Sequence, residues 1–291
     1  MPLLINKTLG ETPLEALERL RAERIAAGEG QFATIPLTYA GRLDPMAEGL
    51  LVVLAGEECK KKADYLGLDK VYETDFLLGM ETDTHDVLGV VQHFTSKISD
   101  DAAHRPVNIS REKIETALKT FLGTRTQAYP AYSSKPYQGR PLFELARAGE
   151  LPSDDEMPKR EVEIYRIEVF GERAVAASEL EKQIIERIAL VKGDFRQAEI
   201  IAKWREFFHA NDQDKEAGAS GIAKNFQLFS LSVHCSGGTY IRSLAHEVGK
   251  RLYASDGASG AGAIAFSIKR TQVGNFTLDA LHTPLSPSQN S

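Results

Sequence analysis

The stretch 39–51, YAGRLDPMAEGLL, sets a single carboxylate, that of Asp44, between a glycine-containing turn and a hydrophobic run. Gly41 permits close backbone approach and Pro45 restricts the backbone, so Asp44 is predicted to lie on a rigid corner. The apolar run LLVVLAG, which starts at Leu50, is typical of a buried strand that would anchor this corner. A carboxylate held in this way is suited to nucleophilic catalysis, although an aspartate before proline is also a common structural turn.

The elements that must position Asp44 are predicted to be a mixture of helices and strands without strict alternation, which indicates an α+β fold. Strands are predicted at 50–54, 71–79, 90–94, 162–170, 226–235, 264–268 and 273–276, and helices at 13–27, 57–66, 110–122, 142–148 and 239–252. Thr12 and Ser110 are placed to cap the helices that follow them. Residues 178–210 are expected to form a helical hairpin or one long broken helix, with a capping box starting at Ser178 and a break at Gly193.

The composition of the chain describes a folded globular protein and excludes several classes. With 291 residues, 42% of them hydrophobic, it can bury a core. The two cysteines, Cys59 and Cys235, are far apart, which argues against a disulfide framework or a zinc site and fits a reducing cytoplasm. The N-terminal residues do not resemble a signal peptide, and no run approaches the roughly 18 apolar residues of a membrane span, so we expect a cytoplasmic protein without membrane contact.

The net charge of −6 argues mildly against nucleic acid as a partner, because nucleic-acid binders usually carry a basic face. A global sum conceals local patches, however. Basic residues gather at 140–147, 159–160 and 269–270, whereas acidic residues gather at 154–156 and 179–186. A localised basic surface is therefore compatible with the composition.

Five blocks of the sequence resemble, in order, the motifs of pseudouridine synthases of the TruB type. They are LLINKTLGETPLEAL, GRLDPMAEGLL with KVYETDFLLGMETDTHDVLG, QAYPAYSSKPYQGRPLFELARAG, VHCSGGTYIRSLAHEVG and IKRTQVGNFTLDAL. Together they cover most of the chain except roughly 172–225. The resemblance implies a pseudouridine-synthase-like fold, with a mixed and largely antiparallel sheet flanked by helices and a helical insertion at about 178–210.

The resemblance also implies a reaction, the isomerisation of a uridine in RNA to pseudouridine without a cofactor or a metal ion. Asp44 matches the family nucleophile, which attacks either the ribose or the base. Arg242 matches the arginine that pairs with this aspartate, and a guanidinium can hold a carboxylate ionised and oriented through two hydrogen bonds. Tyr72 matches the tyrosine that stacks on the flipped base. The base has to leave its stack because its glycosidic bond is otherwise inaccessible.

The remaining expected site residues fall into a base pocket and an RNA-binding surface. The base pocket is expected to contain Tyr39, Leu43, Tyr240 and Ile268. Tyr39 stands where many relatives have histidine, and Ile268 where the family keeps leucine. The RNA-binding side chains are expected to be those of Lys7, Arg42, Lys135, Arg140, Lys269 and Arg270.

We expect a catalytic domain at 1–277, a tail at 278–291 and no appended PUA domain, because too few residues follow Phe276. The expected partner is the T-arm stem-loop of tRNA, bound by a monomer. Arg42 gives the motif a likeness to synthases that modify ribosomal RNA, which is one alternative. A non-catalytic RNA-binding module is another, and it is disfavoured by the joint presence of Asp44, Tyr72 and Arg242. A glycosidase would need a second acidic partner, and none stands out.

Overall fold

The computed structural model describes residues 2–94, 108–209, 225–254 and 262–281. Its main sheet contains β1 (Leu3–Lys7), β2 (Leu37–Ala40), β3 (Ala47–Ala55), β4 (Lys70–Leu78), β7 (Gly123–Ala128), β10 (Lys159–Ala176), β11 (Asn225–Cys235), β12 (Ala263–Val273) and β13 (Phe276–Thr277). The strand order is β1-β3-β12-β4-β11-β10-β7, with β2 paired to β3 and β13 to β12. Only the β3–β12 pairing is parallel among these strands. The predicted α+β fold with a largely antiparallel sheet is confirmed.

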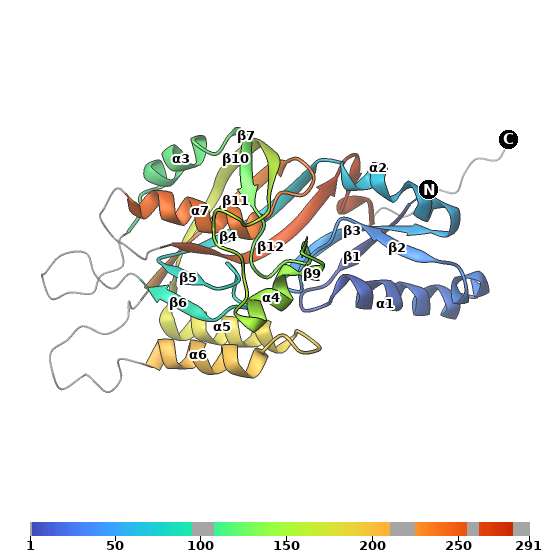
Figure 1. Cartoon of the computed structure of the whole chain (residues 1–291), viewed down its shortest axis with the longest axis horizontal. Helices are drawn as coiled ribbons and strands as arrows, with labels where there is room; N and C mark the ends of the chain where they lie inside the picture. The colour runs from blue at the N-terminus through green and yellow to red at the C-terminus, as the bar shows by residue number, and fades with distance from the viewer. Residues whose placement is uncertain (1, 95–107, 210–224, 255–261, 282–291) are drawn as a thin grey trace, which may run out of the picture.

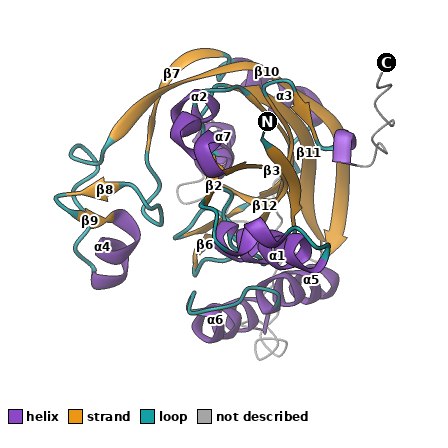
Figure 2. Cartoon of the chain, turned by 90° about the vertical axis from the view of Figure 1, so that its right-hand side faces the viewer, coloured by secondary structure: helices purple, strands orange, loops and turns teal. Residues whose placement is uncertain are grey.

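Two short hairpins stand outside this sheet. β5 (Met80–Thr82) pairs with β6 (Val91–Phe94), and β8 (Pro136–Tyr137) pairs with β9 (Arg140–Pro141). The helices are α1 (Pro13–Ala26), α2 (Lys62–Leu66), α3 (Arg111–Lys119), α4 (Leu142–Ala148), α5 (Ala177–Ala189), α6 (Gln197–His209) and α7 (Ile241–Ala254). Short 3-10 turns lie at Gly30–Ala33, Gly56–Lys61 and Asp279–Leu281. Figure 2 shows β8, β9 and α4 together as an arm that projects from the main sheet.

Helices cover both faces of the sheet, because successive residues of a strand point to opposite sides. Phe76 of β4 belongs to the hydrophobic cluster formed with α3 and α7, whereas the next residue, Leu77, belongs to the cluster formed with α5 and α6. The α5–α6 hairpin therefore packs against the face opposite α7. In Figure 1 the hairpin lies below the sheet and α7 lies above it. This hairpin confirms the first of the two interpretations of residues 178–209; Ala210 lies outside the described residues.

The helix caps predicted from the sequence are confirmed at two of three positions. Thr12 forms a capping box with Glu15, and the Ser110 hydroxyl accepts a hydrogen bond from the Lys113 amide at 3.2 Å. The capping box predicted at Ser178 is wrong, since α5 begins at Ala177 and its N-cap residue is Ala176, without a side-chain cap. The strand predicted at 162–170 is also too short, because β10 extends to Ala176 through its pairing with β11.

The first residues of the tail expected at 278–291 pack against the domain expected at 1–277. Leu278 is buried and Leu281 packs against the cluster that contains Val52 and Val273. The rest of the predicted tail, 282–291, lies outside the described residues. Within the described ranges, no helix is both long and apolar enough to cross a membrane.

Candidate active site

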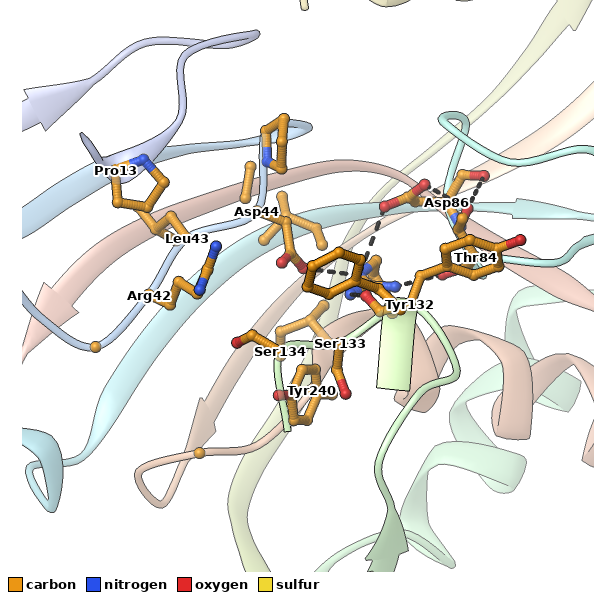
Figure 3. Close-up of a pocket in the computed structure, with 18 of the residues that line it drawn as sticks. Pro13, Arg42, Leu43, Asp44, Thr84, Asp86, Tyr132, Ser133, Ser134 and Tyr240 are labelled. Carbon is orange, nitrogen blue, oxygen red and sulfur yellow. Dashed lines mark hydrogen bonds and ion pairs between the residues drawn. The ribbon is translucent and has the colours of Figure 1, made fainter. Parts of the chain in front are cut away.

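A cavity of about 710 Å³ lies where the loop between β2 and β3 meets the start of α7. Its lining also includes residues from β4, β12, the loop between β5 and β6, the arm and the turn between α5 and α6. Segments from across the whole chain thus converge on one space. Figure 3 shows Asp44 in the middle of the site, with Arg42 and Leu43 on one side of it and Asp86, Thr84 and Tyr132 on the other.

Asp44 occupies the corner that the sequence predicted. Gly41 has φ +82°, a conformation that favours glycine, and the Ala47 amide donates to the Asp44 carbonyl at 2.9 Å. The Gly10 amide donates to the carbonyl of Pro45 at 2.8 Å, which ties the corner to the loop before α1. The backbone of the corner is therefore fixed from both sides, and the Asp44 side chain, 33% exposed, faces the cavity.

Arg242 pairs with Asp44, as expected from the sequence. Its Nε donates to Asp44 Oδ2 at 2.8 Å, and its guanidinium also donates to the carbonyls of Thr84 and Tyr132. The Arg242 side chain is 3% exposed. Burial lowers the pKa of Arg242, but the attraction of Asp44 and Asp86 outweighs it and the pKa is raised overall. Arg242 is thus a fully charged group that fixes the orientation of the Asp44 carboxylate.

Asp86 is a second carboxylate of the site, and the sequence interpretation missed it. Its Oδ2 lies 3.5 Å from Arg242 Nε, and its Oδ1 accepts hydrogen bonds from the Thr84 hydroxyl at 2.7 Å and the Leu88 amide at 2.9 Å. Burial raises the pKa of Asp86 from 3.8 to about 6, against the opposing effect of Arg242. The segment ETDTHDVLG lies in one of the family-like blocks, but no residue of it was expected in the site, although its clustered Thr and Asp residues are the available signal.

Three of the four residues expected in the base pocket line the cavity, as does Tyr72, which was expected to be catalytic. Leu43, Tyr72, Tyr240 and Ile268 all line the cavity. Tyr72 is 8% exposed and burial raises the pKa of its phenol. Tyr240 is held through its backbone, since its amide donates to Gln127 Oε1 at 2.8 Å and its carbonyl accepts from Gln127 Nε2 at 3.1 Å.

The structure does not bring the fourth of these residues, Tyr39, to the cavity. Tyr39 lies outside the cavity lining and packs beside Leu37 on the cluster that contains Ile5. The Lys62 ammonium is 5.3 Å from the centroid of its ring. The cause is strand register, because Tyr39 belongs to β2 and points away from the corner that follows it.

Two of the expected RNA-binding cations are buried and serve the fold instead. Arg270 is 1% exposed and donates to the carbonyls of Leu50, Arg42 and Gly41, so it stabilises the backbone on both sides of Asp44. Lys7 is 0% exposed and donates to the carbonyls of Thr8 and Glu11. Because backbone carbonyls occupy the donors of both side chains, the structure places neither Lys7 nor Arg270 on an exposed surface that could contact phosphates.

The other expected cations differ in location. Arg42 is exposed and lines the cavity, whereas Lys135, Arg140 and Lys269 lie outside its lining. Lys135 lies over the ring of Tyr129 at 5.1 Å, and Arg140 forms an exposed ion pair with Glu150. The structure therefore brings only one of these four residues to the cavity.

The cavity is cationic although the chain is acidic overall. Its charged lining residues are Arg42, Lys70, Arg147, Arg160, Arg196, Arg242 and Arg270 on the positive side and Asp44, Asp86 and Asp194 on the negative side. Arg147 and Arg160 belong to the basic clusters at 140–147 and 159–160, whereas Lys70 and Arg196 are isolated in the sequence and were not expected in the site. An excess of cations around one cavity suits a polyanionic ligand such as RNA.

Comparison with known proteins gives one family match, to the "TruB family pseudouridylate synthase (N terminal domain)", over residues 32–185. The tRNA pseudouridine synthase B of Ralstonia pickettii (strain 12J) is 31% identical over 281 residues, which cover 97% of this chain and 64% of that protein. The protein of the same name from Pseudomonas syringae pv. syringae (strain B728a) is 32% identical, covering 95% and 64%. This chain thus spans about two thirds of the length of these relatives.

Among solved structures, a chain of the "Crystal Structure of a Cbf5-Nop10-Gar1 Complex" matches with a TM-score of 0.47 and 17% identity. The match covers 95% of this chain and 50% of that one.

Proposed function

We propose, on the premise that this chain belongs to the TruB family of pseudouridylate synthases, that it isomerises a uridine of tRNA to pseudouridine. The observation that carries this proposal is the contact between Asp44 and the buried Arg242 inside a cationic cavity. A site of this kind offers one oriented carboxylate, an apolar and aromatic wall and positive charge for the RNA backbone.

The reaction is an internal exchange of one bond for another. The bond between N1 of uracil and C1′ of ribose breaks, the base turns, and a bond forms between C5 and C1′. The proton on C5 is lost and N1 gains one, so the product is an isomer and the balance needs neither a redox step nor a metal. Asp44 acts as the nucleophile, on either the ribose or the base, and the departing uracil itself becomes the incoming group.

The lining of the cavity supports the extrusion of the base. Tyr72 and Tyr240 present aromatic side chains, and Leu43 and Ile268 present apolar ones. A flipped base that stacks on such groups recovers part of the energy lost on leaving the RNA stack. The cationic residues around them, Arg42 and Arg160 among them, are suited to contact the flanking phosphates.

The substrate segment proposed here is the T-arm stem-loop, because unpaired loop bases require the least energy to extrude. We also propose that the protein acts as a monomer, and that residues 1–277 form the catalytic domain, which includes the α5–α6 hairpin. Lys135, Arg140 and Lys269 remain proposed RNA contacts outside the cavity.

The test uses the purified chain with unmodified tRNA, a T-arm stem-loop and a ribosomal RNA fragment, and pseudouridine is mapped by carbodiimide-dependent stops of reverse transcription. We expect conversion of both tRNA and the stem-loop by the native chain, and none by Asp44→Asn. Asp154→Asn is the matched control, since Asp154 is an exposed loop residue outside the cavity lining. Conversion by Asp44→Asn, after deamidation is excluded by mass spectrometry, would refute the assignment. Conversion of the ribosomal fragment alone would move the activity to ribosomal RNA.

A further inference from the structure

The turn between α5 and α6 forms part of the wall of the cavity. Asp194, Phe195 and Arg196 of this turn line the same space as Asp44 and Arg242. The hairpin belongs to the region, roughly 172–225, that the family-like sequence blocks do not cover. The resemblance to the family therefore assigns no role to the hairpin, and its contacts with the site indicate one.

Arg196 makes two contacts that join separate segments of the site. Its Nη2 lies 2.9 Å from Asp83 Oδ2, and its guanidinium carbon is 4.4 Å from the centroid of the Tyr132 ring. The Arg196 and Asp83 side chains are 20% and 15% exposed, so the ion pair is largely shielded from water. Arg196 also has φ +63°, which is uncommon for a residue other than glycine and is maintained only where the surroundings impose it.

The hairpin has its own anchors, so the turn does not depend on the cavity for its position. Ile184, Ile188 and Ile200 are fully buried against the sheet, and Trp204 donates from Nε1 to the carbonyl of Val87 at 3.1 Å. At the turn, Arg147 of the arm donates to the carbonyl of Asp194 at 2.7 Å. The packed hairpin is thus linked to the arm through Arg147.

The segments joined by Arg196 are the ones that hold Arg242. Arg242 donates to the carbonyl of Tyr132 at 3.3 Å and to that of Thr84, the residue next to Asp83. Arg196 touches the side chains of Tyr132 and Asp83. One cation therefore fixes the relative position of two backbone acceptors of the guanidinium that orients Asp44.

We propose that Arg196 is a positioning residue for the isomerisation, acting through Tyr132 and Asp83 on Arg242 and thereby on Asp44. The proposal rests on the proposed function and adds to it a role for the α5–α6 hairpin. Since Arg196 acts on the orientation of the reacting groups, its loss is expected to lower kcat and leave KM for the RNA nearly unchanged.

The test compares Arg196→Ala and Arg196→Lys with the native chain on the T-arm stem-loop. We expect kcat to fall about tenfold in Arg196→Ala, with KM within about threefold of native. Arg196→Lys keeps a cation near Asp83 and Tyr132 and should recover most of the lost kcat, although an ammonium lacks the planar fork. Lys192→Ala is the matched control, because Lys192 is an exposed cation of the same turn that lies outside the cavity lining; it should leave both constants unchanged.

A second measurement does not depend on activity. A double-mutant cycle of Arg196→Ala and Tyr132→Leu in urea unfolding should show coupling between the two side chains. Additive effects would overturn the proposal, as would a kcat for Arg196→Ala equal to that of Lys192→Ala. A raised KM with native kcat would make Arg196 an RNA contact and also overturn it. Absence of pseudouridine with the native chain would instead refute the proposed function, and the unfolding cycle would still decide whether Arg196 holds Tyr132.

Discussion

Removal of Arg242 is expected to destabilise the folded state, because the buried carboxylate of Asp86 loses the cation that compensates its charge. Arg242 is the cation that compensates both Asp44 and Asp86, but the two carboxylates differ in exposure, at 33% and 6%. Water in the cavity can solvate Asp44 after Arg242→Ala. Asp86 has far less access to water, so the uncompensated charge falls on Asp86.

The distance between the two groups sets the size of the effect. At 3.5 Å, and with an effective dielectric constant of about 20, the attraction of Arg242 for Asp86 is about 5 kcal/mol. Its loss must raise the pKa of Asp86 above its native value of about 6. A raised pKa means that the folded state binds the proton more tightly than the unfolded chain. Stability therefore falls as pH rises through the folded pKa, by up to about 1.4 kcal/mol per pH unit.

The assay is urea unfolding of three proteins between pH 6 and pH 8. The contribution of Asp86 should be nearly constant in the native chain over this range, because its pKa of about 6 is already passed. Stability of Arg242→Ala should decline with rising pH, and Arg242→Ala/Asp86→Asn should not show this decline. At pH 8 the double variant should be the more stable of the two variants, while both lack activity. Equal stability of the two variants at every pH would refute the assignment of the buried charge to Asp86.

Two further predictions concern stability. Gly10→Ala should destabilise the fold by about 2 kcal/mol, because Gly10 has φ +82° and an added Cβ would lie 2.5 Å from the Leu190 carbonyl oxygen. Gly28→Ala is the control, since Gly28 has φ +87° but open space around it and should lose only the stability that the strained backbone costs. Equal losses of the two variants in urea unfolding would contradict the clash at Gly10. Burial lowers the pKa of His85 to about 2 and that of His246 to about 4, and their rings stack at 3.9 Å. The unfolded chain therefore takes up protons first, so stability should fall as pH drops from about 6.5 to 4, and His246→Gln should weaken this acid dependence. An unchanged acid dependence in His246→Gln would contradict this assignment.

Local sequence was sufficient for the elements that local chemistry specifies. The capping box at Thr12, the cap at Ser110 and the alternating pattern of β11 each depend on residues within a few positions of one another. The corner at Asp44 could be predicted for the same reason. Its Gly41, Pro45 and following strand are adjacent in the chain, and together they fix the backbone.

The site as a whole could be predicted from the sequence only through the resemblance to a family. The spacing of Asp44 and Arg242, 198 positions apart, carries no physical signal by itself. The family motifs indicated this pair, but they did not indicate which charged residues would be buried. Lys7 and Arg270 look like surface cations in the sequence, and only the packing of β1 and β12 shows that their donors are used by backbone carbonyls.

Tertiary structure alone decided the electrostatics of the cavity and the role of the hairpin. A net charge of −6 is a sum over the sequence, whereas the cavity collects cations from seven separate positions. The hydrophobic period predicted a helical hairpin or one long broken helix at 178–210. The contact of Arg196 with Asp83 and Tyr132 depends on the face of the sheet against which the hairpin packs. The sequence thus determined the local elements and the backbone corner at Asp44, because neighbours in the chain fix them. Long-range packing determined which side chains meet around that corner and which of them are shielded from water.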